Sequence, residues 1–178
     1  PKAKSLYSRL SYNMVARMFS ALDFTFMNLG YSNIDLGIKN KSDEQLVSAN
    51  YLSEQLYKYV AEGGGSWRNK DVLEVGCGRG GGTAFLMQHF QPRSIMACDL
   101  SGLAIRKSKF LYGHINGLTF LQENAIKMSL SDSLFDIVIN IESAHLYPNF
   151  ELFIKEVHRV LRDDGYFLYA GYIDLRNI

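Results

Sequence analysis

A glycine-rich turn after a short apolar run carries the clearest chemical signal in this chain. Glu74 lies within the apolar run, and glycines follow it at positions 76, 78, 80, 81 and 82. Glycines allow backbone amides to approach a ligand closely, and a strand–turn–helix unit of this kind cradles nucleotide-like ligands. Glu74 stands two residues before the first glycine, where its charge disfavours phosphates. The turn therefore predicts a site for a nucleotide-like ligand that brings a cationic group and no phosphate.

A second candidate site follows a later apolar run, in the segment from Asn140 to Pro148. It places Glu142, His145 and Tyr147 within a few residues of one another. Histidine is the natural general base near neutral pH, and a neighbouring carboxylate can orient the imidazole. A single histidine in a loop is more often structural. We nevertheless predict that His145 is a base and Glu142 its partner, because ligands bind beyond the carboxyl ends of parallel strands.

Two further positions could bind a nucleoside. Asp99 ends the second predicted strand and can accept hydrogen bonds from both ribose hydroxyls. After the third strand, Asn124 could bind an adenine edge, and the small Ala125 would leave room for the ring. The spacing of the glycines also satisfies the dinucleotide fingerprint. A nicotinamide-dependent oxidoreductase therefore remains an alternative, although Glu74 argues against it.

These residues need a scaffold in which strands and helices alternate. Apolar runs alternate with helical patterns from position 71 onward, which predicts an α/β fold with a parallel sheet. The expected strands are Val72–Val75, Ser94–Cys98, Leu118–Leu121, Phe135–Ile141 and Tyr166–Ala170. The expected helices are Gly81–Phe90, Ser101–Gly113 and Asn149–Leu161. Ser101 has the residue type and position of an N-cap.

The chain is predicted to have two parts. Residues 1–66 have helical texture and many aromatic side chains, and we expect them to form a helical cap or lid. Residues 67–178 are expected to form the ligand-binding core. Only five strands are recognisable, and the first residue is Pro1. We therefore expect an excised domain or a chain that lacks its C-terminal part.

Bulk properties narrow the function. The chain has 178 residues, 47% of them hydrophobic, and a formal net charge of +1. This balance shows no basic block of the kind that binds nucleic acid, and no apolar run reaches the roughly 20 residues that span a membrane. Cys77 and Cys98 are interpreted as small buried residues, which favours a cytoplasmic location. Basic residues near the N-terminus could face an acidic partner: Lys2, Lys4, Arg9 and Arg17.

Five stretches together resemble class I S-adenosylmethionine-dependent methyltransferases, which have a Rossmann-like fold that ends in an antiparallel hairpin. They are Glu74–Gly80, Asp99-Leu100, Glu123–Ala125, Phe135–Val138 and Val160–Tyr166. The resemblance covers about positions 71 to 172. It departs from the family pattern at Asn124, where an Asp is usual, and at Asp163-Asp164, which replaces Pro-Gly. The hairpin is missing or lies beyond Ile178.

The resemblance implies S-adenosylmethionine as the cofactor and assigns residues to it. Glu74 would orient the glycine loop and interact with the methionine amino group, Asp99 would hold the ribose, and Leu100 would pack on adenine. The full set of implied cofactor-binding residues is Glu74, Gly76, Cys77, Gly78, Gly80, Asp99, Leu100, Asn124, Ala125, Asn140 and Tyr31. Tyr31 belongs to an Asn-x-Gly-Tyr segment similar to the lid of related enzymes. No metal is expected.

A narrower resemblance concerns the acceptor. Glu142-Ser143-Ala144-His145-Leu146-Tyr147-Pro148 is similar to a segment of phthiotriol-type O-methyltransferases and of polyketide-synthase O-methyltransferase domains. It implies methylation of a hydroxyl on a small apolar or acyl-carrier-bound substrate, with an acidic carrier domain as a partner. Carbon or nitrogen methylation, and a domain that binds the cofactor without catalysis, remain open alternatives.

Overall fold

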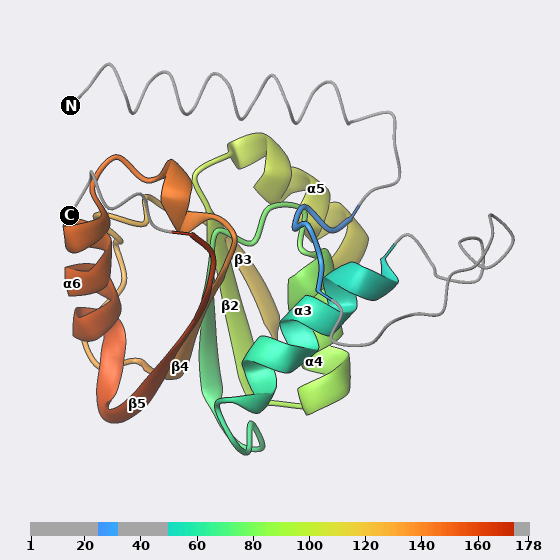
Figure 1. The fold of residues 1–178 in the computed structure, drawn as a ribbon, viewed down its shortest axis with the longest axis horizontal. Helices are drawn as coiled ribbons and strands as arrows, with labels where there is room; N and C mark the ends of the chain where they lie inside the picture. The colour runs from blue at the N-terminus through green and yellow to red at the C-terminus, as the bar shows by residue number, and fades with distance from the viewer. Residues whose placement is uncertain (1–24, 32–49, 173–178) are drawn as a thin grey trace, which may run out of the picture.

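A five-stranded parallel sheet forms the centre of the molecule (Figure 1). The structure is a computed structural model that describes residues 25–31 and 50–172. The strands are β1 (Asp71–Val75), β2 (Ser94–Asp99), β3 (Leu118–Gln122), β4 (Phe135–Ile141) and β5 (Leu161–Ala170). They lie in the order β3-β2-β1-β4-β5, so that β1 is central and the order reverses between β1 and β4. The predicted parallel α/β fold is confirmed.

Helices cover both faces of this sheet (Figure 1). They are α3 (Tyr51–Glu62), α4 (Gly81–Phe90), α5 (Gly102–Tyr112), the short η1 (Ala144–Leu146) and α6 (Phe150–Val160). The first three lie on one face, and α6 lies on the other. None of the helices in the described residues is long and apolar enough to cross a membrane.

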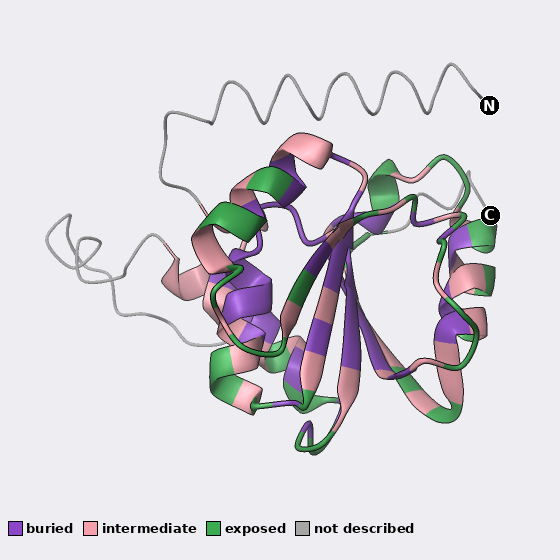
Figure 2. Cartoon of the chain, turned by 180° about the vertical axis from the view of Figure 1, so that it is seen from behind, coloured by how far each residue is buried: buried purple, intermediate pink, exposed green. Residues whose placement is uncertain are grey.

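The central strands are buried on both sides because their side chains alternate between two cores. Val72 packs with α3 against Ile95 and Ile137, whereas Leu73 packs with Phe153 of α6. Figure 2 shows the resulting buried band along the middle of the sheet. This packing gives the carboxyl ends of the strands, where the candidate residues lie, a rigid support.

The strand β5 begins earlier than the sequence predicts. The expected strand starts at Tyr166, but the structure continues directly from α6 into β5 at Leu161. A register irregularity between Phe135 and Ile137 of β4 accommodates the extra residues. Arg162 donates to Asp136 at 2.7 Å and to Asp71 at 3.0 Å. These two bonds hold the start of β5, ahead of the expected first residue Tyr166, along the sheet.

Helix boundaries agree closely with the sequence. Ser101 precedes α5 as its N-cap, and its hydroxyl accepts a hydrogen bond from the Ala104 amide at 3.3 Å. The N-terminal region contributes α3, whose buried side chains include Leu56 and Tyr57. Cys77 and Cys98 are free and buried, as expected. Residues 1–24, with their basic side chains, lie outside the described residues.

An ionic cluster lies at the opposite edge of the sheet, where the strands begin. Asp71 accepts hydrogen bonds from Arg93 and Arg162, and Asp136 binds Arg162 and Lys70. Hydrogen bonds from Arg93 hold the pKa of Asp71 well below its usual range, against the opposing effect of burial. The cluster thus connects the first residues of β1, β4 and β5 away from the candidate site.

Candidate functional site

The glycine loop between β1 and α4 is shaped by positive φ angles. They are +80° at Gly76, +54° at Gly78 and +81° at Gly80, a region that favours glycine. A Cβ on Gly76 would overlap the Ser143 hydroxyl, and one on Gly78 would lie 3.0 Å from the sulfur of Met27. Gly80 faces away from the cavities, toward Phe120. The loop therefore needs glycine at all three positions for conformation, and at Gly76 for space as well.

Two cavities lie at the carboxyl ends of the strands, one on each side of Gly76. The larger encloses about 700 Å³, part of it open to solvent, and the smaller about 340 Å³. The larger is lined by, among others, Gly76, Cys98, Asp99, Leu100, Asn124, Ala125, Ser143 and Tyr147. The smaller is lined by, among others, Met27, Asn28, Gly76, Cys77, Gly78, Glu142 and Ser143. Gly76 and Ser143 line both, so the cavities meet there.

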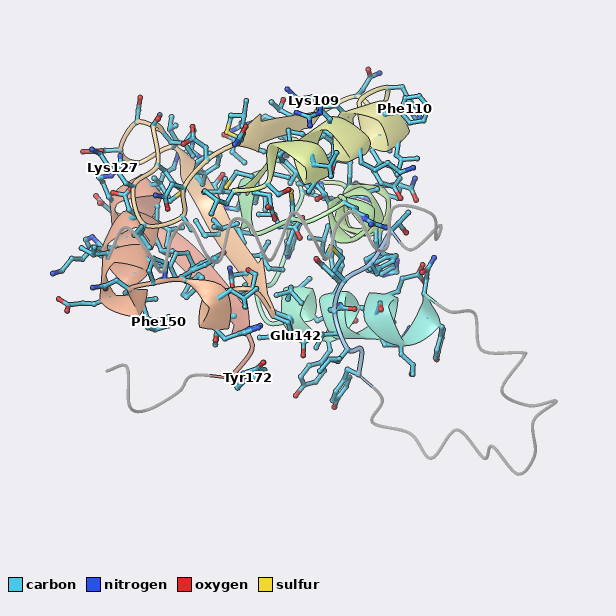
Figure 3. The ribbon with its side chains drawn as sticks, turned by 90° about the horizontal axis from the view of Figure 1, so that it is seen from above. Lys109, Phe110, Lys127, Glu142, Phe150 and Tyr172 are labelled. Atoms are coloured by element: carbon cyan, nitrogen blue, oxygen red, sulfur yellow. The ribbon has the colours of Figure 1, made fainter. Side chains whose placement is uncertain are left out.

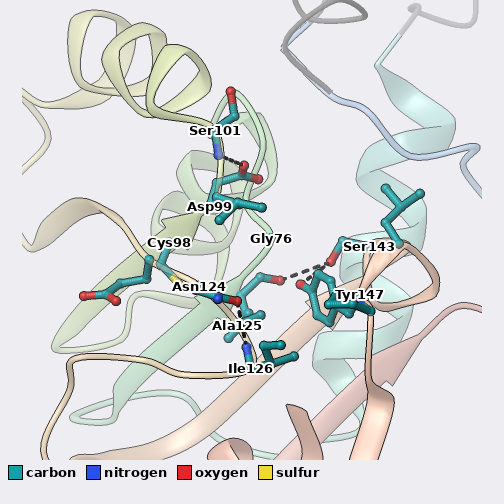
Figure 4. A pocket seen from close by; sticks show the side chains of 14 residues that line it. Gly76, Cys98, Asp99, Ser101, Asn124, Ala125, Ile126, Ser143 and Tyr147 are labelled. Carbon is teal, nitrogen blue, oxygen red and sulfur yellow. Dashed lines mark hydrogen bonds between the residues drawn. The ribbon is translucent and has the colours of Figure 1, made fainter. Parts of the chain in front are cut away.

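Asp99 lies in the larger cavity with its carboxylate held by the backbone. Its Oδ2 accepts from the Gly78 amide at 3.0 Å. Its Oδ1 accepts from the Ser101 amide at 2.8 Å (Figure 4). Burial raises its pKa, and the two amide hydrogen bonds partly offset this effect. A carboxylate has about four acceptor positions, so each oxygen can still accept a hydroxyl of a bound ribose.

The other predicted nucleoside-binding residues line the same cavity. Leu100 and Ala125 lie on its wall, and the Asn124 side chain accepts a hydrogen bond from the Ile126 amide at 3.2 Å. This bond orients the Asn124 side chain at the cavity (Figure 4). Asp99, Leu100, Asn124 and Ala125 thus converge from the ends of β2 and β3.

Glu74 is only 1% exposed and lines neither cavity. One carboxylate oxygen accepts from the Tyr57 hydroxyl at 2.7 Å and the other from the Thr83 hydroxyl at 2.5 Å. Burial raises its pKa. Glu74 therefore ties β1 to α3 and α4, which suits the expected role of orienting the loop.

Asn140, Ser143 and Tyr147 form a polar network between the two cavities. The Asn140 amide nitrogen lies 2.8 Å from the Val75 carbonyl oxygen, 2.8 Å from the Ser143 hydroxyl and 3.0 Å from the Tyr147 hydroxyl. The two hydroxyls are 3.0 Å apart (Figure 4). Asn140 is fully buried and lines neither cavity. Asn140 contacts Ser143 and Tyr147, which do line the cavities. Neither of these two residues is assigned to the cofactor by the sequence.

Glu142 lines the smaller cavity and holds the N-terminal segment 25–31. Its carboxylate accepts the Leu29 backbone amide at 2.6 Å, and its own φ of +47° lies in the left-handed region. Non-glycine residues rarely adopt this region, and they do so most often where structure over-determines the backbone. The same segment covers the start of α4, because the Gly81 amide donates to the Thr25 carbonyl at 3.3 Å.

His145 is exposed at the rim and lines neither cavity. Its ring stacks on Tyr172 with centroids 4.5 Å apart. Burial by its neighbours lowers its pKa, and the Glu142 charge raises it in part. Within the described residues no hydrogen bond or ion pair joins Glu142 to His145. Glu142 therefore acts on the imidazole through its charge. Figure 3 labels Glu142 and Tyr172, the residue on which the imidazole stacks.

Tyr31 also lies away from both cavities. Its amide donates to the Leu52 carbonyl at 2.9 Å, and its ring stacks on Tyr59 at 4.6 Å. Gly30, with a φ of +84° and no room for a Cβ beside Leu52, turns the chain in this direction. Met27 and Asn28 of the same segment line the smaller cavity instead.

The arrangement suits a nucleoside joined to a short charged tail. Asp99 and its neighbours offer a ribose acceptor and an apolar wall in the larger cavity. The smaller cavity offers the glycine backbone and the Glu142 carboxylate, which can receive an ammonium group. No three His, Cys, Asp or Glu side chains come together as metal ligands in residues 25–31 and 50–172.

This fold and this site define an α/β domain of the methyltransferase class. Residues 73–169, more than half of the chain, match the family described as "Methyltransferase domain". The chain belongs to this family, which confirms the S-adenosylmethionine-dependent class predicted from its sequence.

Curated relatives are similar over most of the chain. It is 40% identical to a fatty-acid O-methyltransferase of Mycolicibacterium smegmatis, over 91% of this chain and 58% of the relative. It is 34% identical to a phthiotriol/phenolphthiotriol dimycocerosates methyltransferase of Mycobacterium tuberculosis, over 94% of this chain and 60% of the relative. The chain thus spans less than two thirds of the length of these relatives.

A solved structure supports the fold. Geranyl diphosphate C-methyltransferase from Streptomyces coelicolor, solved with S-adenosylhomocysteine, superposes with a TM-score of 0.76 at 17% identity. The similarity covers 92% of this chain and 63% of that structure. At this level of identity the comparison speaks for the shared fold alone.

Proposed function

We propose that this chain carries the catalytic core of an S-adenosylmethionine-dependent O-methyltransferase that acts on an apolar, lipid-type substrate. The observation that carries the proposal is the pair of cavities joined at Gly76, with Asp99 in one and Glu142 in the other. The relatives named as fatty-acid and phthiotriol-type methyltransferases support the acceptor class.

Each cavity receives one half of the cofactor in this proposal. Asp99 accepts the ribose hydroxyls, and Leu100, Asn124 and Ala125 hold the adenine. The backbone of Gly76, Cys77 and Gly78 lies along the methionine half, and Glu142 attracts its ammonium group. Glu74 holds the glycine loop through Tyr57 and Thr83 without touching the cofactor.

S-adenosylmethionine, when bound, supplies a methyl group that is already activated for in-line displacement. The protein therefore contributes mainly positioning. A hydroxyl acceptor must also lose a proton, and we assign His145 to accept it at an imidazole nitrogen. A base of this kind contributes roughly 10²–10⁴ in rate. Glu142 supports it by stabilising the protonated imidazole.

Exposed apolar side chains near the two cavities support an apolar acceptor. Met27 lines the smaller cavity and Leu146 lines the larger one. Leu29 is 85% exposed, and Met27 and Leu146 are also exposed. Leu29 and Met27 belong to the segment that Glu142 holds, and Leu146 follows His145. An alkyl chain laid along these side chains would bury apolar surface and bring its polar end to the Glu142–His145 loop.

The variant His145→Ala tests the base. We expect turnover of an alcohol to fall by at least about 100-fold, while calorimetric S-adenosylmethionine affinity stays unchanged because His145 lines neither cavity. His158→Ala, an exposed histidine of α6, is the matched control and should retain turnover. Near-normal alcohol turnover in His145→Ala would contradict the assignment.

A second candidate is methylation of a carboxylate, which the position of His145 favours. A fatty-acid carboxylate is ionised at neutral pH and needs no base, so a site whose histidine lies outside the cavities would suffice. His145→Ala should then retain turnover with a long-chain fatty acid. Paired assays of the alcohol and the acid distinguish the two acceptors, and amine or enol substrates would reveal nitrogen or carbon methylation.

We extend the proposal to partners and location. An acyl-carrier-bound acceptor would bring an acidic domain to the basic N-terminal residues, which lie outside the described part of the chain. Two buried, reduced cysteines favour the cytoplasm,. Pull-down with an acidic carrier domain, with Lys2, Lys4, Arg9 and Arg17 changed to Ser as the comparison, tests the partner.

A further inference from the structure

The point where the two cavities meet is rich in oxygen atoms. The Val75 carbonyl, the Ser143 hydroxyl and the Tyr147 hydroxyl gather around the Asn140 amide nitrogen, at 2.8, 2.8 and 3.0 Å. Ser143 and Tyr147 occupy the space that a Cβ of Gly76 would need. We name Val75, Asn140, Ser143 and Tyr147, together with Gly76, the junction. Figure 4 shows Gly76, Ser143 and Tyr147.

Hydrogen-bond acceptors exceed donors at the junction. The Asn140 amide brings two hydrogens and each hydroxyl one, whereas each of the three oxygens offers two lone pairs. The Asn140 Oδ1 is also buried and has no hydrogen-bond partner among the described residues. Unused acceptor capacity in a buried place is costly unless a donor or a cation completes it.

The junction is electron-rich without a formal charge. The buried carboxylates nearby bond to other groups: Glu74 to Tyr57 and Thr83, and Asp99 to two backbone amides in the larger cavity. Burial raises the pKa of Tyr147 well above its usual value, so its hydroxyl stays neutral. Edge-on packing of its ring against Phe153, at 4.9 Å, holds this hydroxyl in place.

A cofactor that fills both cavities must cross the junction, because Gly76 and Ser143 are the lining residues that the two cavities share. The adenosyl and methionine halves of S-adenosylmethionine are joined by its sulfonium. We propose that Ser143 and Tyr147, oriented by Asn140, bind this sulfonium and make the site prefer the methyl donor over its neutral demethylated product. The proposal rests on the assigned cofactor and is independent of the acceptor.

The physical basis is the polarised carbon–hydrogen bonds around a positively charged sulfur. They donate to the hydroxyl oxygens as weak C–H···O hydrogen bonds, each of which contributes about 0.5–1 kcal/mol, or roughly 2–5-fold in affinity. S-adenosylhomocysteine has a neutral sulfur and lacks the methyl group, so it forfeits this interaction. Sinefungin carries an ammonium group at this position and can form stronger, charge-assisted bonds.

Calorimetric titration of the full chain with these three ligands tests the proposal. In Tyr147→Phe and in Ser143→Ala, we expect S-adenosylmethionine to lose about 2–5-fold in affinity and sinefungin about tenfold or more. S-adenosylhomocysteine should change least. The ratio of the three dissociation constants, not any single one, is the readout.

The matched control is Tyr166→Phe, an exposed tyrosine of β5, which should leave all three affinities unchanged. An equal loss for all three ligands would show that the hydroxyls only support the fold and would overturn the proposal. So would unchanged ratios in both variants. If the unaltered chain bound none of the three, the cofactor assignment itself would fall, whereas binding without turnover would leave this proposal standing and remove the catalytic one.

Discussion

The imidazole of His145 has an unusual environment for a residue at the surface. It stacks on Tyr172, which is itself 61% exposed, and it follows the cavity-lining residues Glu142 and Ser143 by only a few positions. The stacked ring removes water from one side of the imidazole. The neutral form, which a general base needs, is therefore favoured.

We expect the pKa of His145 to lie below 6.5, and Tyr172→Ala to raise it toward that value. Loss of the stacked ring returns water to the imidazole, and the Glu142 charge then dominates. NMR titration of the imidazole resonances, assigned with His145→Gln, measures the pKa. The alcohol turnover rate should fall on the acid side at the same pKa and shift with it in Tyr172→Ala. A pKa above 6.5 in the unaltered chain would contradict this picture.

The sequence predicted the nucleoside-binding residues of the larger cavity better than the residues where the two cavities meet. Asp99, Asn124 and Ala125 follow strands in the sequence, so strand order alone brings them to one cavity. Ser143 and Tyr147 are ordinary loop residues by type, and their role depends on the missing Cβ of Gly76. Tyr31 is predicted to close over the cofactor or substrate, and the turn at Gly30 places its ring against Tyr59. Placement of this kind depends on backbone geometry that residue types do not encode.

At the scale of elements, α3 and α4 pack closely because Gly82 has no side chain. A Cβ there would overlap the Tyr57 ring, whose hydroxyl donates to Glu74. The close approach therefore also maintains the bond that ties the glycine loop to α3.

Gly82→Ala should destabilise the fold by about 1–3 kcal/mol through overpacking, despite the better helix propensity of alanine. It should also weaken cofactor binding, because Tyr57 can no longer hold Glu74. Urea unfolding and calorimetry measure the two effects. Gly102→Ala is the control: its Cβ would meet only the end of the exposed Gln122 side chain, at 2.6 Å, which can move. Equal stability of the two variants would refute the packing argument.

Element boundaries were predictable where local chemistry sets them. Ser101 caps α5 by a bond within its own turn. The early start of β5 was not predictable, because Arg162 is held there by Asp71 and Asp136, which come from other strands. Pairing between distant segments decided that boundary.

At the scale of the whole molecule, stability and binding are placed at opposite edges of the sheet. The Asp71–Arg93–Arg162–Asp136 cluster lies where strands begin, and both cavities lie where they end. The sequence indicated a parallel sheet but not the order of its strands. That order is a matter of pairing between distant segments, such as Val72 of β1 with Ile137 of β4.

Asp71→Asn should lower the free energy of unfolding by about 1–2 kcal/mol at pH 7, a modest value because both arginines are partly exposed. The pKa of Asp71 is lowered in the folded state, so its contribution is present above about pH 4 and is lost as the pH falls through the folded value,. The difference from the unaltered chain should therefore shrink at pH 3. Urea unfolding at both pH values tests this.

Cofactor affinity at pH 7 should not change in Asp71→Asn, since the cluster is remote from the cavities. A parallel loss of affinity would mean that the two edges of the sheet are coupled.

The bond between the Leu29 amide and Glu142 joins positions 113 residues apart. During synthesis on the ribosome, the segment around Leu29 emerges long before the loop after β4. It must therefore wait, without its carboxylate partner, until Glu142 has left the exit tunnel. The binding cavity is completed only at that late moment, so a nascent chain that stalls before β4 can form its first strands but cannot close the site.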